Sequence, residues 1–204
     1  MIPIQNVYYM LSYAFQVLNE QGYKNIATEQ FHNTGELMAA ILEKGIAIQL
    51  KRGLGKEYIP QTEALSSLRG KIDIAESIKT QSMLRKQLIC TYDEFSVNST
   101  MNRIIKSTAA LLLRSNISKQ RKKNLRKLMM YFGEVDFIDL HTVNWNVQYN
   151  RNNQTYRMLI SVCYLVVKGL LQTQSDGSTQ LMDFLDEQRM CRLYEKFILE
   201  YYRK

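Results

Sequence analysis

Apolar residues recur at spacings of three and four over several long stretches of the chain, a pattern that predicts amphipathic helices. Asn6 can cap a first helix, and Asn33 followed by Glu36 resembles the capping box of a second. The second helix should run to about Lys51 and end at Gly53, because glycine readily takes the left-handed conformation after a helix. Its expected buried positions are Leu37, Ile41 and Ile48.

The pattern changes to that of β-strands in the middle of the chain. Short apolar and β-branched stretches occupy residues 57–68 and 71–74, on either side of Gly70. Residues 87–95 alternate in the manner of a strand with two distinct faces. We therefore expect a small antiparallel sheet in the first half of the chain.

Helical spacing returns after this sheet. A third helix should start at Asn98 or Ser99, and Ser118 can cap a fourth, very basic helix. Residues 135–149 are ambiguous between strand and loop, and residues 155–171 read as a buried helix. The fold class predicted from these elements is α+β, rich in helix.

A polar stretch close to the C-terminus is the best linker in the chain. It covers residues 172–179, contains Gly177 and has no large apolar side chain. We expect one domain over residues 1–175, a linker over 176–185, and an amphipathic helix over 186–204 that needs a surface on which to pack.

The positive charge is concentrated in one segment. The net charge is +8, yet no acidic residue occurs between Glu94 and Glu134. Three interpretations remain open: a solvated helix face, a surface that contacts phosphate, or a surface for an acidic protein. No aromatic residue lies between Arg103 and Met130, so stacking on single-stranded bases is not indicated. The candidate DNA-binding residues are Lys119, Arg121, Lys122, Lys123, Arg126 and Lys127.

The cysteines and histidines do not form a metal-binding pattern. The three cysteines are far apart in apolar runs, which indicates buried, reduced thiols and suits a cytoplasmic protein. Only His32 and His141 occur, and neither has a helical partner, so no metal site is expected. Asp136 and Asp139 lack a third ligand. Residues 158–171 are apolar but too short to span a membrane comfortably.

Catalytic motifs are absent from the sequence. There is no GxxxxGK[ST] loop, no GxSxG elbow and no HExxH. None of the aspartates and glutamates is followed two positions later by lysine, so the D/E-x-K part of a PD-(D/E)xK nuclease is missing as well. We expect no cofactor to bind this chain.

Several blocks of sequence nevertheless point to one family. The chain opens with IPIQNVYYMLSYA at residues 2–14 and continues with LRGKID at residues 68–73. TYD at residues 91–93, NRIIK at residues 102–106 and MCRLYEKF at residues 190–197 follow in order. The order and spacing of these blocks resemble the N-terminal part of McrC, the nuclease subunit of the McrBC methylcytosine-dependent restriction system.

The resemblance implies a function in two parts. McrC-like proteins dock through their N-terminal part into the pore of a McrB ring, a GTP-hydrolysing AAA+ motor, and stimulate hydrolysis. Their C-terminal part cuts DNA with a divalent metal. Carried over by position, Arg69, Lys71 and Arg103 are candidates for polar contacts at the docking surface. The alternative for each is a turn residue or an ordinary surface charge.

The missing nuclease motif shapes the expected function. We expect residues 1–175 to be the motor-docking domain and residues 186–204 to be the first helix leading into a nuclease domain that this truncated chain lacks. By itself the chain should not cleave DNA. The alternative is a basic, non-sequence-specific DNA-binding module without a motor partner.

Overall fold

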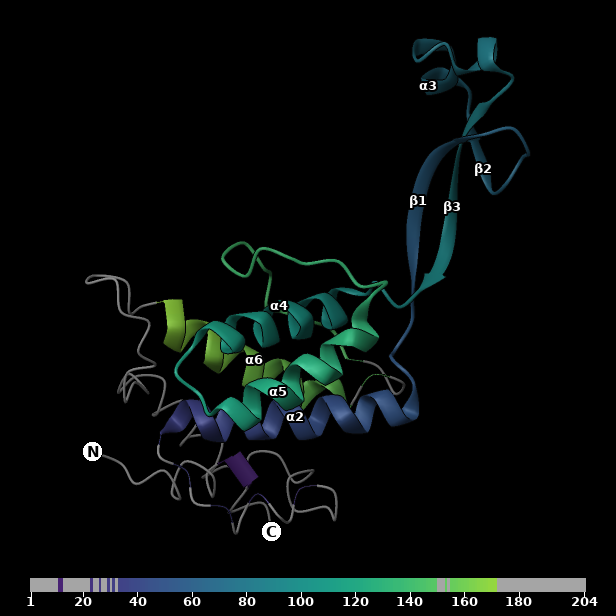
Figure 1. The fold of residues 1–204 in the computed structure, drawn as a ribbon. Coiled ribbons are helices and arrows are strands. Elements are labelled where there is room, and N and C mark those ends of the chain that lie inside the picture. Colours follow the sequence, from purple (N-terminus) through teal and green to yellow (C-terminus); the bar gives the residue numbers. More distant parts are fainter. Residues whose placement is uncertain are drawn as a thin grey trace. The chain divides into compact units, whose positions relative to one another are not determined.

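The computed structural model describes residues 33–149 and 155–171, together with residues 11, 12, 23, 26, 29, 31 and 153. Its elements are helices and one small antiparallel sheet, so the predicted α+β class is confirmed (Figure 1). The chain forms two compact units. A helical unit comprises Met1–Leu54 and Thr100–Lys204, and an inserted unit comprises Gly55–Ser99.

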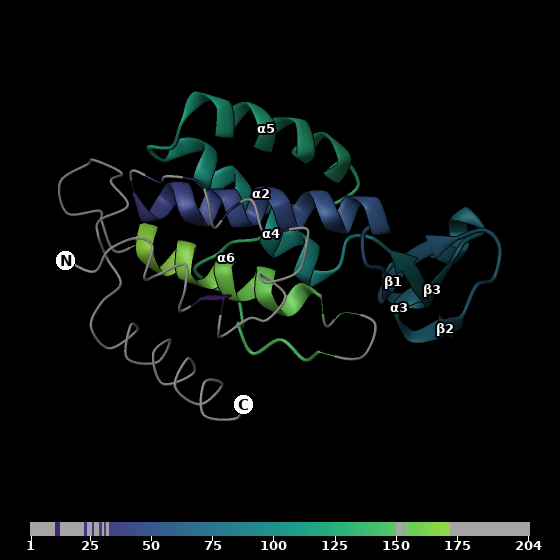
Figure 2. The ribbon, with the colours of Figure 1, turned by 90° about the horizontal axis from the view of Figure 1, so that it is seen from below.

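The helical unit contains four described α-helices. They are α2 (Thr34–Arg52), α4 (Thr100–Arg114), α5 (Lys119–Met129) and α6 (Tyr156–Leu171). α2 and α4 each contact both α5 and α6, so they form the middle of the unit, with α5 at one edge (Figure 2). The short 3₁₀ helix η4 (Met130–Phe132) follows α5 directly.

The helix ends follow the predicted local signals. The Asn33 side chain accepts a hydrogen bond from the Glu36 backbone nitrogen at 2.8 Å, and Gly53 ends α2 at φ 86°. The Ser118 hydroxyl accepts from the Arg121 backbone nitrogen at the start of α5. These caps satisfy backbone groups that have no partner inside the helix.

Apolar side chains of α2, α4 and α6 make the core of the helical unit. As expected, Leu37 and Ile41 of α2 are fully buried, whereas Ile48 is only half-buried. A Cβ atom at Gly45 of α2 would lie 2.1 Å from a Leu159 methyl carbon of α6, so glycine allows the two helices to approach closely. Other buried core residues are Ile104, Ala109, Leu112, Val162, Cys163, Val166 and Val167.

The inserted unit is a three-stranded antiparallel sheet with a small helical end. Its strands are β1 (Glu57–Leu65), β2 (Lys71–Asp73) and β3 (Leu88–Ser96), in the order β1-β3-β2. β1 and β3 pair along their full lengths, from Glu57 opposite Ser96 to Leu65 opposite Leu88. Helix α3 (Ile74–Lys79) and the 3₁₀ helix η3 (Ser82–Arg85) connect β2 to β3.

Polar contacts hold the helical end of the inserted unit. The buried Ser77 hydroxyl donates to the Asp73 carbonyl at 2.6 Å and accepts from the Ile89 backbone nitrogen at 2.8 Å. The buried Ser82 hydroxyl donates to the Ser77 carbonyl. Cys90 is the only fully buried apolar residue among residues 55–99, so this unit has almost no apolar core.

Several predictions fall on other parts of the chain. Leu11 and Ser12 are helical and buried, but the rest of the predicted first helix lies outside the described residues. The predicted linker (176–185) and last helix (186–204) also lie outside them. Residues 133–149 form turns and coil. In the part of the chain that the structure describes, no helix is long and apolar enough to cross a membrane.

Candidate functional site

The turn before β2 lies directly against β3. Gly70 has φ 68°, and a Cβ atom there would lie 2.4 Å from the Thr91 carbonyl oxygen and 2.7 Å from Tyr92 Cβ. Only glycine combines a positive φ with so close an approach to a neighbouring backbone. The sequence therefore fixes the position of the two basic residues that flank Gly70.

Arg69 packs on an aromatic ring. Its guanidinium carbon lies 3.8 Å from the centroid of the Tyr92 ring of β3. The Tyr92 hydroxyl donates a hydrogen bond to the Glu63 carboxylate of β1, and this bond raises the pKa of Tyr92. Stacking on Tyr92 restricts the Arg69 side chain, yet the residue stays exposed, so its donors can reach a partner.

Lys71 begins the edge strand β2. Its Cα partner is Thr91, and the residue is exposed. Within the described residues it makes no ion pair. Arg69 and Lys71 thus place two positive charges on either side of one rigid turn.

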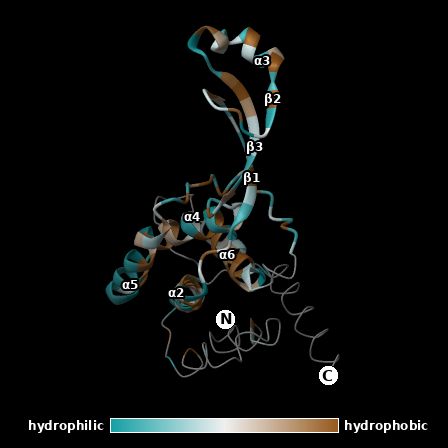
Figure 3. Ribbon diagram, turned by 90° about the vertical axis from the view of Figure 1, so that its right-hand side faces the viewer, coloured by the Kyte–Doolittle hydropathy of each residue, from teal (hydrophilic) through white to brown (hydrophobic). Residues whose placement is uncertain are grey.

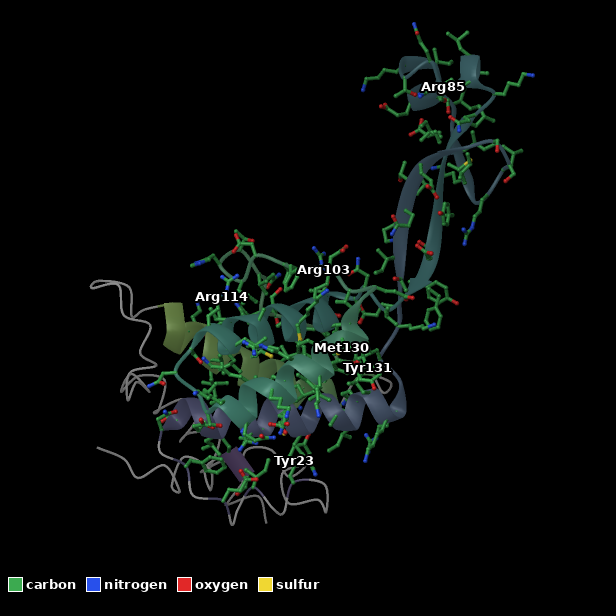
Figure 4. The ribbon with its side chains drawn as sticks, in the orientation of Figure 1. Tyr23, Arg85, Arg103, Arg114, Met130 and Tyr131 are labelled. Carbon is green, nitrogen blue, oxygen red and sulfur yellow. The ribbon has the colours of Figure 1, made fainter. Side chains whose placement is uncertain are left out.

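Large apolar side chains are exposed at the helical end of the inserted unit, where Figure 3 colours parts of the ribbon as hydrophobic. Leu84 of η3 is 81% exposed, a high value for a leucine in an ordered element. Figure 4 shows the next residue, Arg85, at the end of the unit opposite the two chain connections. Clustered apolar exposure of this kind marks an interaction surface. We call this cluster the apolar tip; its members, from α3 and η3, are Ile74, Ile78, Met83 and Leu84.

Arg103 belongs to α4 of the helical unit, not to the inserted unit. Its Nη2 donates to the Phe137 carbonyl oxygen at 3.2 Å. One turn further along α4, Lys106 Nζ donates to the Phe132 and Val135 carbonyls and lies 4.6 Å from the Phe137 ring centroid. Both residues therefore hold the segment after η4 against α4.

Arg121 of α5 points inward to three carboxylates. Its guanidinium lies 2.8 Å from Glu29, 3.0 Å from Glu43 and 3.7 Å from Glu36. Burial opposes the charge, but the hydrogen bonds that Arg121 donates to Glu29 and Glu43 outweigh it and raise the pKa of Arg121. Glu36 also accepts a hydrogen bond from the Ser118 backbone nitrogen. Sequence analysis grouped Arg121 with the candidate DNA-binding residues, whereas in the structure its side chain joins α5 to α2.

The other basic residues of α5 are mainly exposed to solvent. Lys119, Lys123, Arg126 and Lys127 are exposed, whereas Lys122 is half-buried. At 3.6 residues per turn, the four exposed residues fall within an arc of about 100° on the side away from Leu125, the buried residue of this helix. Sequence reasoning missed this division because the partners of Arg121 lie far away in the chain.

The described residues form neither a metal-binding cluster nor a reactive cysteine. No group of three His, Cys, Asp or Glu side chains could hold a metal ion there. Asp139 accepts a hydrogen bond from the His141 backbone nitrogen at 3.0 Å, which is a turn contact. Cys90 and Cys163 are buried free thiols, and burial raises the pKa of Cys163 to about 12. Such a thiol is a poor nucleophile.

Comparisons with known proteins agree with the sequence blocks. Residues 4–204 match the family described as McrBC 5-methylcytosine restriction system component. The type IV methyl-directed restriction enzyme EcoKMcrBC of Escherichia coli (strain K12) is 31% identical over 212 residues. That alignment covers 100% of this chain but only 59% of the relative.

Two solved structures share the fold. The cryo-EM structure of the Thermococcus gammatolerans McrBC complex matches with a TM-score of 0.61 and 21% identity, covering 99% of this chain and 58% of the matched chain. The refined half-complex of T. gammatolerans McrB AAA+ hexamers with bound McrC matches with a TM-score of 0.58 and 21% identity, covering 94% and 46%. The chain belongs to the family of McrBC 5-methylcytosine restriction system components.

Proposed function

We propose that this chain is a McrC-like component of a 5-methylcytosine-specific restriction system, which docks on a McrB-like AAA+ GTPase hexamer and stimulates its GTP hydrolysis. The observation that carries the proposal is the inserted unit, whose apolar tip is exposed while its core is almost absent. Such a unit gains stability by burying the apolar tip on a partner. One structural relative contains McrB AAA+ hexamers with bound McrC, which supports this choice of partner.

Arg69 and Lys71 are the proposed polar contacts of the docking surface. Gly70 fixes the backbone of the turn between them, and Tyr92 restricts the Arg69 side chain, so the Arg69 charge is ordered before the partner binds. A side chain ordered in advance loses less entropy on binding. Arg103 has a different proposed part, because its hydrogen bond to Phe137 lets it support its own unit.

Other features of the proposal concern location and cofactors. We place the chain in the cytoplasm, in keeping with the buried free thiols of Cys90 and Cys163. GTP belongs to the motor, and a divalent metal belongs to a nuclease domain of the McrC type. This chain contributes binding energy and position, with no cofactor of its own.

The test measures GTP turnover by the cognate motor with and without the chain. We expect wild-type chain to co-elute with the ring and to raise turnover. Arg69→Ala or Lys71→Ala should reduce the stimulation at least several-fold without changing the melting temperature. Lys79→Ala is the matched control, because Lys79 is an exposed cation of the same unit whose ion pair with Glu76 lies on the surface.

Two results would contradict the proposal. The first is that wild-type chain neither binds the ring nor changes its GTP turnover. The second is that Lys79→Ala reduces stimulation as much as the two test variants, which would show that the bulk charge of the inserted unit acts instead of the Arg69–Lys71 turn.

A further inference from the structure

We infer that the outer face of α5 binds the phosphate backbone of duplex DNA. This surface belongs to a different unit from the Arg69–Lys71 turn and serves a different partner, so the inference goes beyond motor docking. We call it the α5 outer face; its members are Lys119, Lys123, Arg126 and Lys127, together with Met130 and Tyr131 at its end.

The cations of the α5 outer face extend over a length that covers several phosphates of a DNA strand. From Lys119 to Lys127 the helix rises about 12 Å, at 1.5 Å per residue. Over that distance one strand of a duplex presents about three or four phosphates, because phosphates on one strand repeat every 3.4 Å along the axis. The long lysine and arginine side chains of the α5 outer face can therefore contact several phosphates together.

No acidic side chain on α5 weakens this field. The helix itself has none, and its sequence neighbours are free of acids from Phe95 to Gly133. The carboxylates that lie near α5, Glu29, Glu36 and Glu43, are engaged on its inner side by Arg121. α5 also lies at the edge of the helical unit (Figure 2). Among the residues that the structure describes, the outer cations therefore make no ion pair.

Exposed apolar groups at the end of α5 distinguish this face from an ordinary solvated helix. Met130 is 81% exposed and Tyr131 is 71% exposed, and both follow the last cation (Figure 4). On a duplex, such side chains can pack on sugars or enter the minor groove while the cations hold the phosphates. A row of four cations with no acidic side chain among them suits a polyanion such as DNA better than an acidic protein, whose surface mixes carboxylates with other side chains.

The experiment measures binding of the whole chain to a fluorescent 20-base-pair duplex by anisotropy, over a range of salt concentrations. Four phosphate contacts predict that the slope of log K against log salt includes a contribution of about −3.6. The variant Lys119→Gln/Lys123→Gln/Arg126→Gln/Lys127→Gln should lose this contribution and bind at least 100-fold more weakly at low salt. Tyr131→Ala should weaken binding with an unchanged slope, because it removes no charge.

A charge-matched control separates the α5 outer face from net charge. Lys44→Gln/Lys51→Gln/Arg52→Gln/Lys79→Gln removes the same number of exposed cations elsewhere and should retain the wild-type slope. Glutamine keeps a good helix propensity in both variants, and their melting temperatures should stay close to wild type.

Three outcomes would overturn the inference. The α5 variant could bind DNA as wild type does, or the control variant could lose as much affinity. The α5 variant could also lose stimulation of the motor in the absence of DNA, which would assign the α5 outer face to an acidic protein. Failure of motor docking alone would leave the DNA result intact, so the two proposals fail separately.

Discussion

Gly70 is the residue on which the turn between Arg69 and Lys71 depends most. Gly70→Ala would place a methyl group 2.4 Å from the Thr91 carbonyl oxygen and hold alanine at a φ of 68°. We expect the inserted unit to lose about 2–5 kcal/mol of stability, from the left-handed backbone and the steric overlap together. Hydrogen exchange of β3 amides measures this loss within the unit.

Gly53 provides the comparison for Gly70. Its φ is also positive, at 86°, but a Cβ atom there would have nothing within 4 Å. Gly53→Ala should therefore cost only about 1–2 kcal/mol, the backbone contribution alone. Equal costs at the two glycines would show that the approach of the turn to β3 is not tight.

Cys163 makes the helical unit sensitive to alkaline pH. Its thiol has a pKa raised from 9.0 to about 12 by burial, so the folded chain keeps a proton that the unfolded chain releases. This contribution to stability is complete below pH 9 and is lost as the pH rises toward 12. The slope is at most about 1.4 kcal/mol per pH unit.

Cys163→Ala should remove this slope. Denaturant unfolding at pH 8 and pH 10.5 should show wild type losing about 2 kcal/mol more than the variant. Val166→Ala, at a buried position of the same helix, removes a similar volume without an ionisable group and should keep the wild-type slope. A slope unchanged in Cys163→Ala would mean that other groups control the alkaline limit.

At the scale of elements, α5 is fastened to α2 by charge more than by apolar packing. Only Leu125 of α5 is fully buried, while Arg121 reaches three carboxylates. Arg121→Met keeps the apolar stem but leaves those carboxylates without a cation. We expect a loss of about 2–4 kcal/mol in the free energy of unfolding, measured with denaturant.

The exposed ion pair of Lys79 provides a comparison for the Arg121 cluster. Its ion pair with Glu76 has side chains that are 77% and 42% exposed, so water screens it well. Lys79→Met should therefore change stability by less than about 1 kcal/mol. If Arg121→Met cost no more than this, the carboxylate cluster would have no structural role.

The elements also show what the sequence could and could not predict. Caps at Asn33 and Ser118 involve residues three positions apart, so the sequence displays both partners, and both helices begin where expected. Arg121 and Glu29 are 92 positions apart, and no local pattern connects them. Sequence reasoning therefore grouped Arg121 with its outward neighbours, and the structure separates it.

The candidate site shows the same difference between local features, which the sequence reveals, and contacts between distant residues, which it does not. Gly70 and its two basic neighbours could be selected from the sequence, since the block LRGKID is contiguous. The stacking of Arg69 on Tyr92 and the exposure of Leu84 depend on pairing between β1 and β3 and on a helical end without a core. These are properties of the folded unit, and the apolar tip was not foreseen.

At the scale of the whole molecule, the chain combines a helical unit with a unit inserted between α2 and α4. The family assignment covers both units, because the family match runs over residues 4–204. The two units bury side chains in different ways: the helical unit has an apolar core, and the inserted unit depends on serine hydrogen bonds and strand pairing. Changes on the surface of one need not disturb the packing of the other.

The pairing of Glu57 with Ser96 has a consequence for how such proteins can diverge. The inserted unit leaves and rejoins the helical unit through two chain positions that lie side by side, about 5 Å apart as opposed residues of an antiparallel pair. A short turn closes a gap of that size at small entropic cost. Recombination could therefore exchange residues 57–96 as one cassette. A lineage that exchanges this cassette changes the proposed docking unit in a single genetic event, while its helical core keeps the same sequence.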